Sequence, residues 1–209
     1  MPYGHVVSIE RQTVNTASFN PAADYPYNLR QIDFAAAMQD VYDFLFDINV
    51  HLVGTKGLPR LDDTLRTANM SGMLSDMLTA SVAKHSRGLV VNREHNGHPD
   101  LLVGGVYPND AVKNGELGVE IKSTVKRGGA VDTHGARDQT LCVFVYTIDR
   151  RTEPAVDRAA MRFTEIYLSK VTKADFVARA RNTDIGTRTA NVAGAGLQRF
   201  REAWVYLDR

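Results

Sequence analysis

The sequence predicts a single α/β domain, and two regions with different periodicity carry that prediction. Residues 31–87 place apolar side chains three and four positions apart, which is typical of amphipathic helices. Residues 88–170 hold short runs rich in Val, Ile, Leu, Phe and Tyr, separated by glycine and asparagine, which is typical of a sheet. The chain shows neither a repeat nor a linker, so its 209 residues fit one domain with a substantial core.

Two helices are expected in the first region. The earlier one begins at Gln31, after an irregular arm over residues 1–30 that three prolines interrupt, and ends before Gly54. The later one covers about residues 71–86, and Gly88 follows its end. Its methionine-rich stripe is best explained by packing in the core.

Five apolar runs follow and are expected to be strands. They cover residues 89–92, 101–107, 117–123, 141–148 and 163–168. Helical patterns over residues 173–181 and 192–202 then lead into a last apolar run at residues 203–207.

Composition excludes several classes of protein. No apolar run approaches the ~18 residues that span a bilayer, and the first residues lack the basic and apolar regions of a secretory signal. The single cysteine, Cys142, rules out an internal disulfide and a structural zinc site. We therefore expect a soluble cytoplasmic protein with no membrane partner.

Charge is distributed unevenly along the chain. Residues 1–120 carry 9 Lys+Arg and 14 Asp+Glu, whereas residues 150–209 carry 12 and 7. A basic C-terminal part suits a polyanionic partner, although an imbalance of this size is also common in proteins without one.

One group of charged residues in the sheet region is a candidate catalytic site. Asp100 begins one apolar run, and Glu120 and Lys122 lie two apart on the next, so their side chains share a face while Val119 and Ile121 face the core. Two carboxylates and an ammonium that converge on buried strands suit metal-assisted phosphodiester hydrolysis. Carboxylate oxygens bind Mg²⁺, the backbone carbonyl of Ile121 is a further ligand, and the lysine positions water or stabilises the transition state. The alternative is a Pro-Asp turn followed by a surface Glu/Lys pair on an edge strand.

This pattern resembles the PD-(D/E)XK nuclease superfamily and, within it, type II restriction endonucleases. Pro99 and Asp100 match the first element, and Glu120-Ile121-Lys122 match the second without departure. The resemblance implies a restriction endonuclease-like core, in which helices flank a mixed central β-sheet with the active site at a sheet edge. It implies Asp100 and Glu120 as Mg²⁺ ligands and Lys122 as the catalytic lysine.

Many members of this superfamily add an acidic ligand from a preceding helix. Asp76, in the 71–86 helix, is our candidate here, and Glu94 is the alternative. His95 and His98 flank the Pro-Asp element, where one of them could assist phosphate binding or both could be loop residues without a role.

Two polar segments are candidates for DNA contact. The first follows the catalytic strand and is rich in glycine and hydrogen-bond donors, and the second is the Arg-, Asn- and Thr-rich stretch 179–191. Each segment could also be an ordinary solvated loop. The residues expected to contact DNA are Lys126, Arg127, His134, Arg137, Gln139, Arg181, Asn182, Arg188 and Asn191.

The sequence thus predicts a DNA endonuclease that depends on Mg²⁺, for which Mn²⁺ can substitute. A sequence-specific type II restriction enzyme is the favoured interpretation, acting on double-stranded DNA as a homodimer and paired with a DNA methyltransferase. The alternatives are a structure-selective or repair nuclease of the same fold and a DNA-binding protein that does not cleave.

Overall fold

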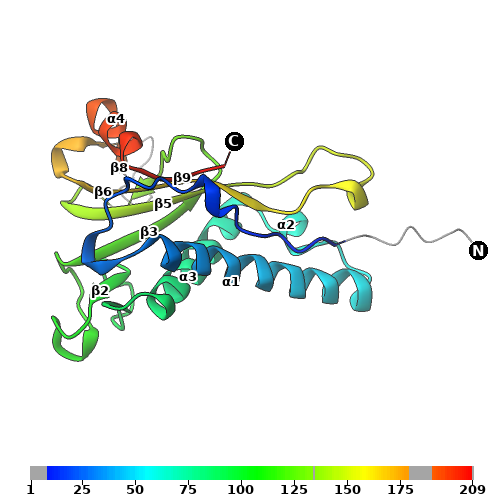
Figure 1. The fold of residues 1–209 in the computed structure, drawn as a ribbon, viewed down its shortest axis with the longest axis horizontal. Coiled ribbons are helices and arrows are strands. Elements are labelled where there is room, and N and C mark those ends of the chain that lie inside the picture. Colours follow the sequence, from blue (N-terminus) through cyan, green and yellow to red (C-terminus); the bar gives the residue numbers. More distant parts are fainter. Residues whose placement is uncertain (1–8, 134, 179–189, 209) are drawn as a thin grey trace, which may run out of the picture.

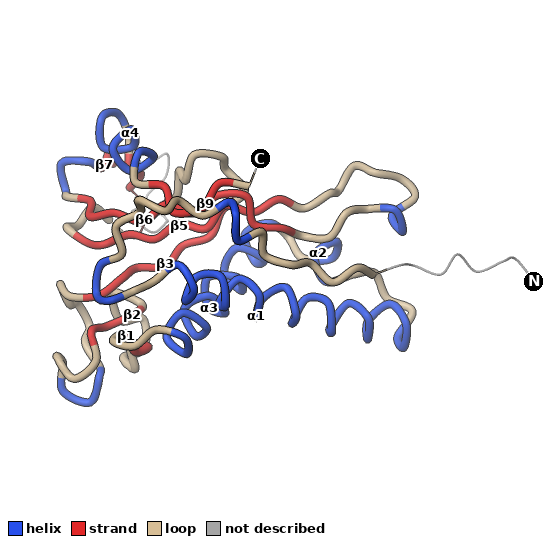
Figure 2. The backbone as a smooth tube through the Cα atoms, viewed as in Figure 1, coloured by secondary structure: helices blue, strands red, loops and turns tan. Residues whose placement is uncertain are grey.

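A computed structural model of the chain describes residues 9–133, 135–178 and 190–208. Its centre is a six-stranded mixed sheet with helices on both faces, so the predicted α/β class is confirmed (Figures 1 and 2). The helices are α1 (Gln31–Val50), α2 (Leu61–Thr64), α3 (Thr67–His85) and α4 (Gly194–Glu202). Within the described ranges, no helix combines the length and the apolar character that crossing a membrane requires.

The main sheet is mixed because one pair of its strands is parallel. In spatial order its strands are β1 (Leu89–Val91), β2 (Leu101–Val103), β3 (Gly118–Thr124), β5 (Gln139–Thr147), β6 (Arg162–Val171) and β9 (Trp204–Leu207). Strands β3 and β5 run parallel, and the other neighbours are antiparallel. A smaller sheet joins β4 (Asp132–Thr133), β8 (Ala190–Val192) and β7 (Phe176–Ala178).

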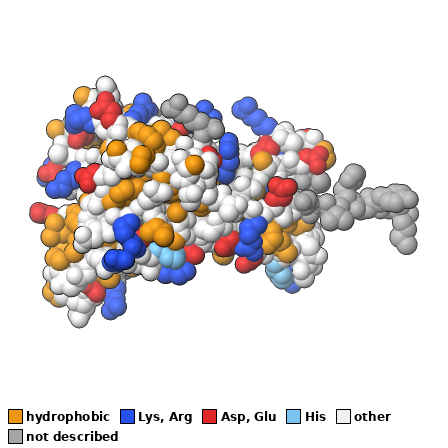
Figure 3. All heavy atoms as spheres, in the orientation of Figure 1, with side chains coloured by type: hydrophobic (Ala, Val, Ile, Leu, Met, Phe, Trp, Pro, Cys, Tyr) orange, Lys and Arg blue, Asp and Glu red, His pale blue; other side chains and the backbone are white. Residues whose placement is uncertain are grey.

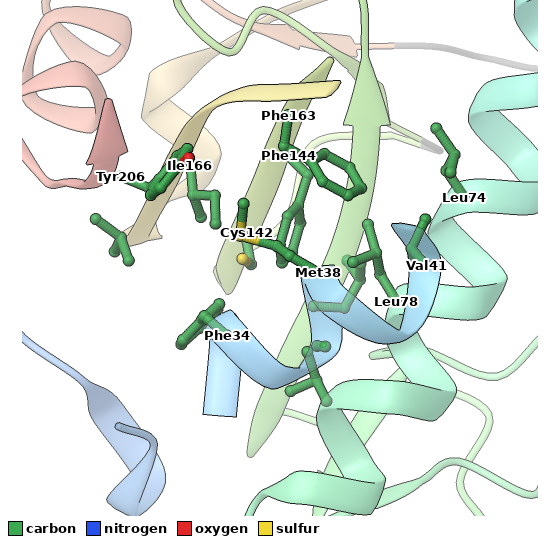
Figure 4. Close-up of a cluster of buried hydrophobic side chains, with 14 of the residues drawn as sticks. Phe34, Met38, Val41, Leu74, Leu78, Cys142, Phe144, Phe163, Ile166 and Tyr206 are labelled. Carbon is green, nitrogen blue, oxygen red and sulfur yellow. The ribbon is translucent and has the colours of Figure 1, made fainter. Parts of the chain in front are cut away.

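The two faces of the sheet have separate cores. Cys142 and Phe144 of β5 point toward α1 and α3, where they meet Phe34, Met38 and Leu74 (Figure 4). Leu141, Val143 and Val145 point to the opposite face, together with Phe200 of α4. Because β5 is covered on both faces, its sequence is a continuous apolar run without polar alternation.

Gly118 allows β2 and β3 to approach one another. Its φ of +152° is rarely adopted by residues with a side chain, and a Cβ atom there would lie 1.9 Å from the carbonyl oxygen of Leu101. The close approach aligns Leu101 with Val119. Asp100, just before β2, is thereby brought beside Glu120.

The helix α1 ends at Val50, before Gly54 as predicted, and a π-helical turn, His51–Thr55, follows it directly. One predicted element is wrong. The helix predicted at residues 173–181 is instead a 3₁₀ turn, Lys173–Asp175, followed by β7. Pairing of β7 with β8 outweighs the local helical pattern.

The other predicted elements differ mainly in length. The helix α1 begins at Gln31 as predicted, whereas α3 begins at Thr67, before the expected residue 71. The strand β2 ends at Val103, well short of the expected residue 107.

Candidate active site

Asp100, Glu120 and Lys122 converge where β2 and β3 stop pairing in the main sheet. The Nζ atom of Lys122 lies 2.5 Å from Oε1 of Glu120 and 3.8 Å from Oδ2 of Asp100. Val119 and Ile121, between and beside them, are buried in the core under α1 and α3. The alternation predicted from the sequence is therefore present, and the charged side chains lie on the opposite face of β3.

The edge of β3 is open beside this cluster. β2 begins only at Leu101, so β3 has no strand partner on that side beyond Val119. Side chains accept the outward N–H groups instead: Oδ2 of Asp100 accepts from Ile121 at 2.8 Å, and Oγ of Ser75 accepts from Ser123 at 3.0 Å. The N–H and C=O groups of one strand residue point to the same side, so the carbonyl of Ile121 also faces the edge where Asp100 lies.

The two carboxyl groups differ in their affinity for protons. Burial and the charge of Glu120 raise the pKa of Asp100 to about 6. Burial acts in the same direction on Glu120, but contacts with His98 and Lys122 outweigh it and lower its pKa to about 2. The same carboxylates raise the pKa of Lys122 against the opposing effect of its burial. Two buried carboxylates thus share one ammonium, and the remaining basic group of the cluster is the imidazole of His98.

His98 is the fourth member of the cluster, and the sequence did not assign it this position. Its Nδ1 atom lies 2.7 Å from Oε2 of Glu120, within ion-pair range although not aligned for a hydrogen bond. Both side chains are largely buried. The available signal was its place two residues before Asp100, which puts it at the same end of the strand.

The donor set fits a hard divalent cation. Mg²⁺ keeps several waters and typically takes only one or two carboxylates from a protein. Asp100, Glu120 and the carbonyl of Ile121 supply oxygen ligands only. The described residues hold no group of three or more His, Cys, Asp or Glu side chains arranged to bind a metal, so these two carboxylates are the acidic ligands on which such a site would depend.

Asp76 and Glu94 lie in different surroundings. Asp76 is exposed on α3, next to Ser75, and its charge contributes to the raised pKa of Lys122. Glu94 belongs to a turn in which its backbone N–H donates to the side chain of Asn92. Electrostatic proximity to the cluster therefore favours Asp76 as the additional acidic residue. His95 is exposed in the same turn as Glu94.

The residues predicted to contact DNA fall into several places. Arg137 and Gln139 line a groove of ≈ 600 Å³ that also includes His98. Arg127 is exposed and lines a second groove of ≈ 550 Å³, with Arg162 and Arg201. The Nζ atom of Lys126 is 3.9 Å from Oδ2 of Asp132, and Asn191 lies on β8. His134, Arg181, Asn182 and Arg188 lie outside the described residues.

Acidic and basic side chains are interspersed over the face of the molecule shown in Figure 3. The charge difference between the two halves of the chain therefore does not give this face one sign. The reason is the fold, since β6 and β9 from the basic half pair into the same sheet as β1 to β3 from the acidic half. Of the two grooves, the one lined by Arg137 shares His98 with the site.

No protein-family model, curated protein or solved structure matches this chain. The geometry of the site and the chemistry of its residues therefore carry the functional argument.

Proposed function

We propose that this protein is a Mg²⁺-dependent DNA endonuclease with a restriction endonuclease-like core. The observation that carries the proposal is the convergence of Asp100, Glu120 and Lys122 at the open edge of β3. Their order along the chain and their position on neighbouring strands are those that the resemblance to PD-(D/E)XK nucleases implies. A structural ion pair between Glu120 and Lys122 would not need Asp100 as well, and burial of a further carboxylate is unfavourable for the fold alone.

In this proposal Asp100, Glu120 and the Ile121 carbonyl hold Mg²⁺ or Mn²⁺, with Asp76 as an outer acidic residue. The bound ion supplies a polarised phosphoryl oxygen and a water of lowered pKa. The protein contributes the fixed positions of its ligands: the Ile121 N–H holds Asp100, and His98 restrains Glu120.

Lys122 acts on the phosphate itself. Its ammonium group stays protonated between the two carboxylates, so it is available to orient the attacking water and to stabilise negative charge that develops on the phosphoryl oxygens. The largely buried position of Lys122 strengthens this electrostatic effect, because surrounding water screens it less.

The preferred substrate is double-stranded DNA, cut at a specific sequence by a homodimer, with a DNA methyltransferase protecting the host sites. The proposal places the protein in the cytoplasm. The nucleic-acid substrate is supported by the resemblance of the motif together with the basic side chains of the groove that includes His98.

The test is incubation of the purified protein with unmethylated phage DNA and Mg²⁺, followed by mapping of the fragment ends. Discrete ends are expected for a restriction enzyme. Cleavage restricted to branched or damaged substrates would instead assign a repair nuclease, and binding without cleavage would assign a non-cleaving DNA-binding protein. Glu120→Gln should remove the activity, whereas Glu202→Gln, which neutralises an exposed acid on α4, should retain it.

A further inference from the structure

The groove beside His98 has the features of a binding site. It has a volume of ≈ 600 Å³ and lies between the loop at residues 114–117, the start of β5 and the end of β6. His98 belongs both to its wall and to the cluster around Glu120, so the groove lies next to the candidate active site.

A buried amide group without a partner lines this groove. Gln139 is 7% exposed, and its Nε2 atom has no hydrogen-bond partner among the described residues. Burial of an unpaired donor costs about 1–3 kcal/mol, so its retention here calls for an explanation. A ligand with acceptor oxygens would satisfy this donor.

Strand register places Gln139 on the face of the sheet that carries the active site. Gln139 pairs with Val171, and Glu120 pairs with Leu141, and both of these apolar partners belong to the core on the same face. Gln139 is two residues from Leu141 along β5, which corresponds to about 7 Å. A chain bound at Glu120 therefore needs to extend only a short distance to reach Gln139.

The charged residues of the groove favour an anion. Lys170 and Lys173 are both exposed, and neither makes an ion pair within the described part of the chain. Arg137 adds a third basic group. Of the two acids in the lining, Asp138 accepts a hydrogen bond from the backbone N–H of Lys173 at 2.7 Å. The lining has no Phe, Tyr or Trp on which a base could stack.

We propose that this groove binds the phosphodiester backbone of a nucleic-acid strand next to the phosphate that is cut. Gln139 donates to a phosphate oxygen, and Lys170 and Lys173 neutralise neighbouring phosphates. These contacts hold the strand in position without reading its sequence. The inference rests on the proposed nuclease function, because it assumes that the strand continues from the site at Glu120.

The test is a salt titration of binding to two duplexes of unrelated sequence, in excess chelator so that the strand stays intact. Lys170→Ala/Lys173→Ala should reduce the slope of log K against log salt by about two and weaken binding to both duplexes equally. Lys56→Ala/Arg151→Ala is the matched control, because it removes two exposed charges at the other end of the molecule and should leave the slope unchanged.

Gln139→Leu separates binding from folding. Leucine fills similar space and removes the unpaired donor, so the melting temperature should stay the same or rise. Binding should nevertheless weaken by about 10-fold for both duplexes, which corresponds to one hydrogen bond to a charged acceptor. If Gln139 had only a structural role, Gln139→Leu would lower the melting temperature and leave the affinity per folded molecule unchanged.

The inference is overturned if the wild type binds neither duplex, if the double lysine variant keeps its slope, or if the loss depends on sequence. If the wild type cleaves DNA and the double lysine variant keeps the wild-type slope of log K against log salt, the nuclease proposal stands and the groove has no part in it. If the double lysine variant has a reduced salt slope but the wild type cleaves no DNA with Mg²⁺, the groove binds nucleic acid and the nuclease proposal is refuted.

Discussion

Two clusters of buried charge in this molecule have opposite designs. In the first, Asp100 and Glu120 share the single ammonium of Lys122. In the second, Arg60 lies 3.1 Å from Asp63 and 4.0 Å from Asp62, and Arg158 lies 3.2 Å from Asp63, so two arginines face two aspartates. The first cluster lies at an open strand edge, whereas the second lies between α2 and the loop that precedes β6, beside a pocket of ≈ 280 Å³ that Arg60, Asp62 and Arg158 line.

The balanced cluster connects segments that are distant in the sequence. Arg60 donates to the carbonyl of Arg158 at 2.7 Å, and Asn49 at the end of α1 donates to Asp62 at 3.0 Å. Each of the two arginines and two aspartates meets an opposite charge, while Oδ2 of Asp62 has no hydrogen-bond partner among the described residues. Pairing of opposite charges is what buried ions need in order to stabilise a fold. The comparison teaches that carboxylates in excess of lysine and arginine, rather than burial of charge itself, distinguish the candidate active site.

The largest expected effect is on DNA cleavage, which should depend on the cluster around Lys122 and not on the cluster around Arg60. Lys122→Met should lower the rate of DNA cleavage by at least about 100-fold, because it removes the charge that stabilises the transition state. Arg60→Met should leave the rate per folded molecule close to that of the wild type. Single-turnover cleavage at saturating Mg²⁺ measures both variants. Equal rates for Lys122→Met and the wild type would remove the lysine from the mechanism.

The next effect separates the clusters by stability. Arg60→Met should cost about 3–5 kcal/mol in the free energy of unfolding, because Asp63 loses one of its two buried partners. That corresponds to a melting temperature lower by about 6–20 °C. The melting temperature is measured by thermal denaturation monitored by circular dichroism.

A second variant is the control for this prediction. Arg60→Met/Asp63→Leu replaces the pair by apolar groups and should recover much of the loss. A fall for the double variant as large as the sum of the two single changes would show that these residues do not act as a pair.

The fold was largely predictable from periodicity, and the exceptions have physical causes. Apolar runs such as Leu141–Ile148 are buried on both faces and so are recognisable without knowledge of their neighbours. Residues 176–178 were not recognisable as a strand, because their partner β8 lies more than ten residues further along the chain. Local pattern cannot report such pairing.

The core of the candidate site was predictable for a similar reason. Glu120 and Lys122 are two apart on one strand, so their shared face follows from the geometry of a strand alone. The contact of His98 with Glu120 depends on the register between strands, and the groove around Gln139 depends on the junction of three segments. Neither is encoded in local spacing.

A smaller effect tests whether His98 positions Glu120. His98→Ala should raise the Mg²⁺ concentration needed for half-maximal cleavage by about 10-fold, because the Glu120 carboxylate loses a restraint. His98→Asn retains an N–H donor near the position of Nδ1 and should restore most of the affinity. Binding of Mn²⁺ followed by electron paramagnetic resonance gives a second readout that does not depend on cleavage. Equal metal affinity in all three proteins would show that the contact has no positioning role.

The smallest effect concerns the stability of the metal-free protein. The pKa of Asp100 is raised from 3.8 to about 6 in the folded state, so its contribution to stability is fully present below about pH 4 and is lost as the pH rises through 6. Asp100→Asn has no charge to lose. In excess chelator its melting temperature should match that of the wild type near pH 4 and exceed it by a few degrees above pH 7, and a pKa raised from 3.8 to about 6 sets an upper limit of about 3 kcal/mol on the difference.

Addition of Mg²⁺ at pH 7 should reverse that order. A ligand that binds only the folded state stabilises it in proportion to its affinity, and Asp100→Asn lacks one of the two carboxylates. The wild type should therefore gain more in melting temperature than the variant does. The balanced cluster provides the contrast, since Asp63→Asn leaves Arg60 and Arg158 without their shared buried anion and should lower the melting temperature with or without metal. If Asp100→Asn also destabilises the metal-free protein at pH 7, the carboxylate excess at the site is compensated, and the distinction between the two clusters fails.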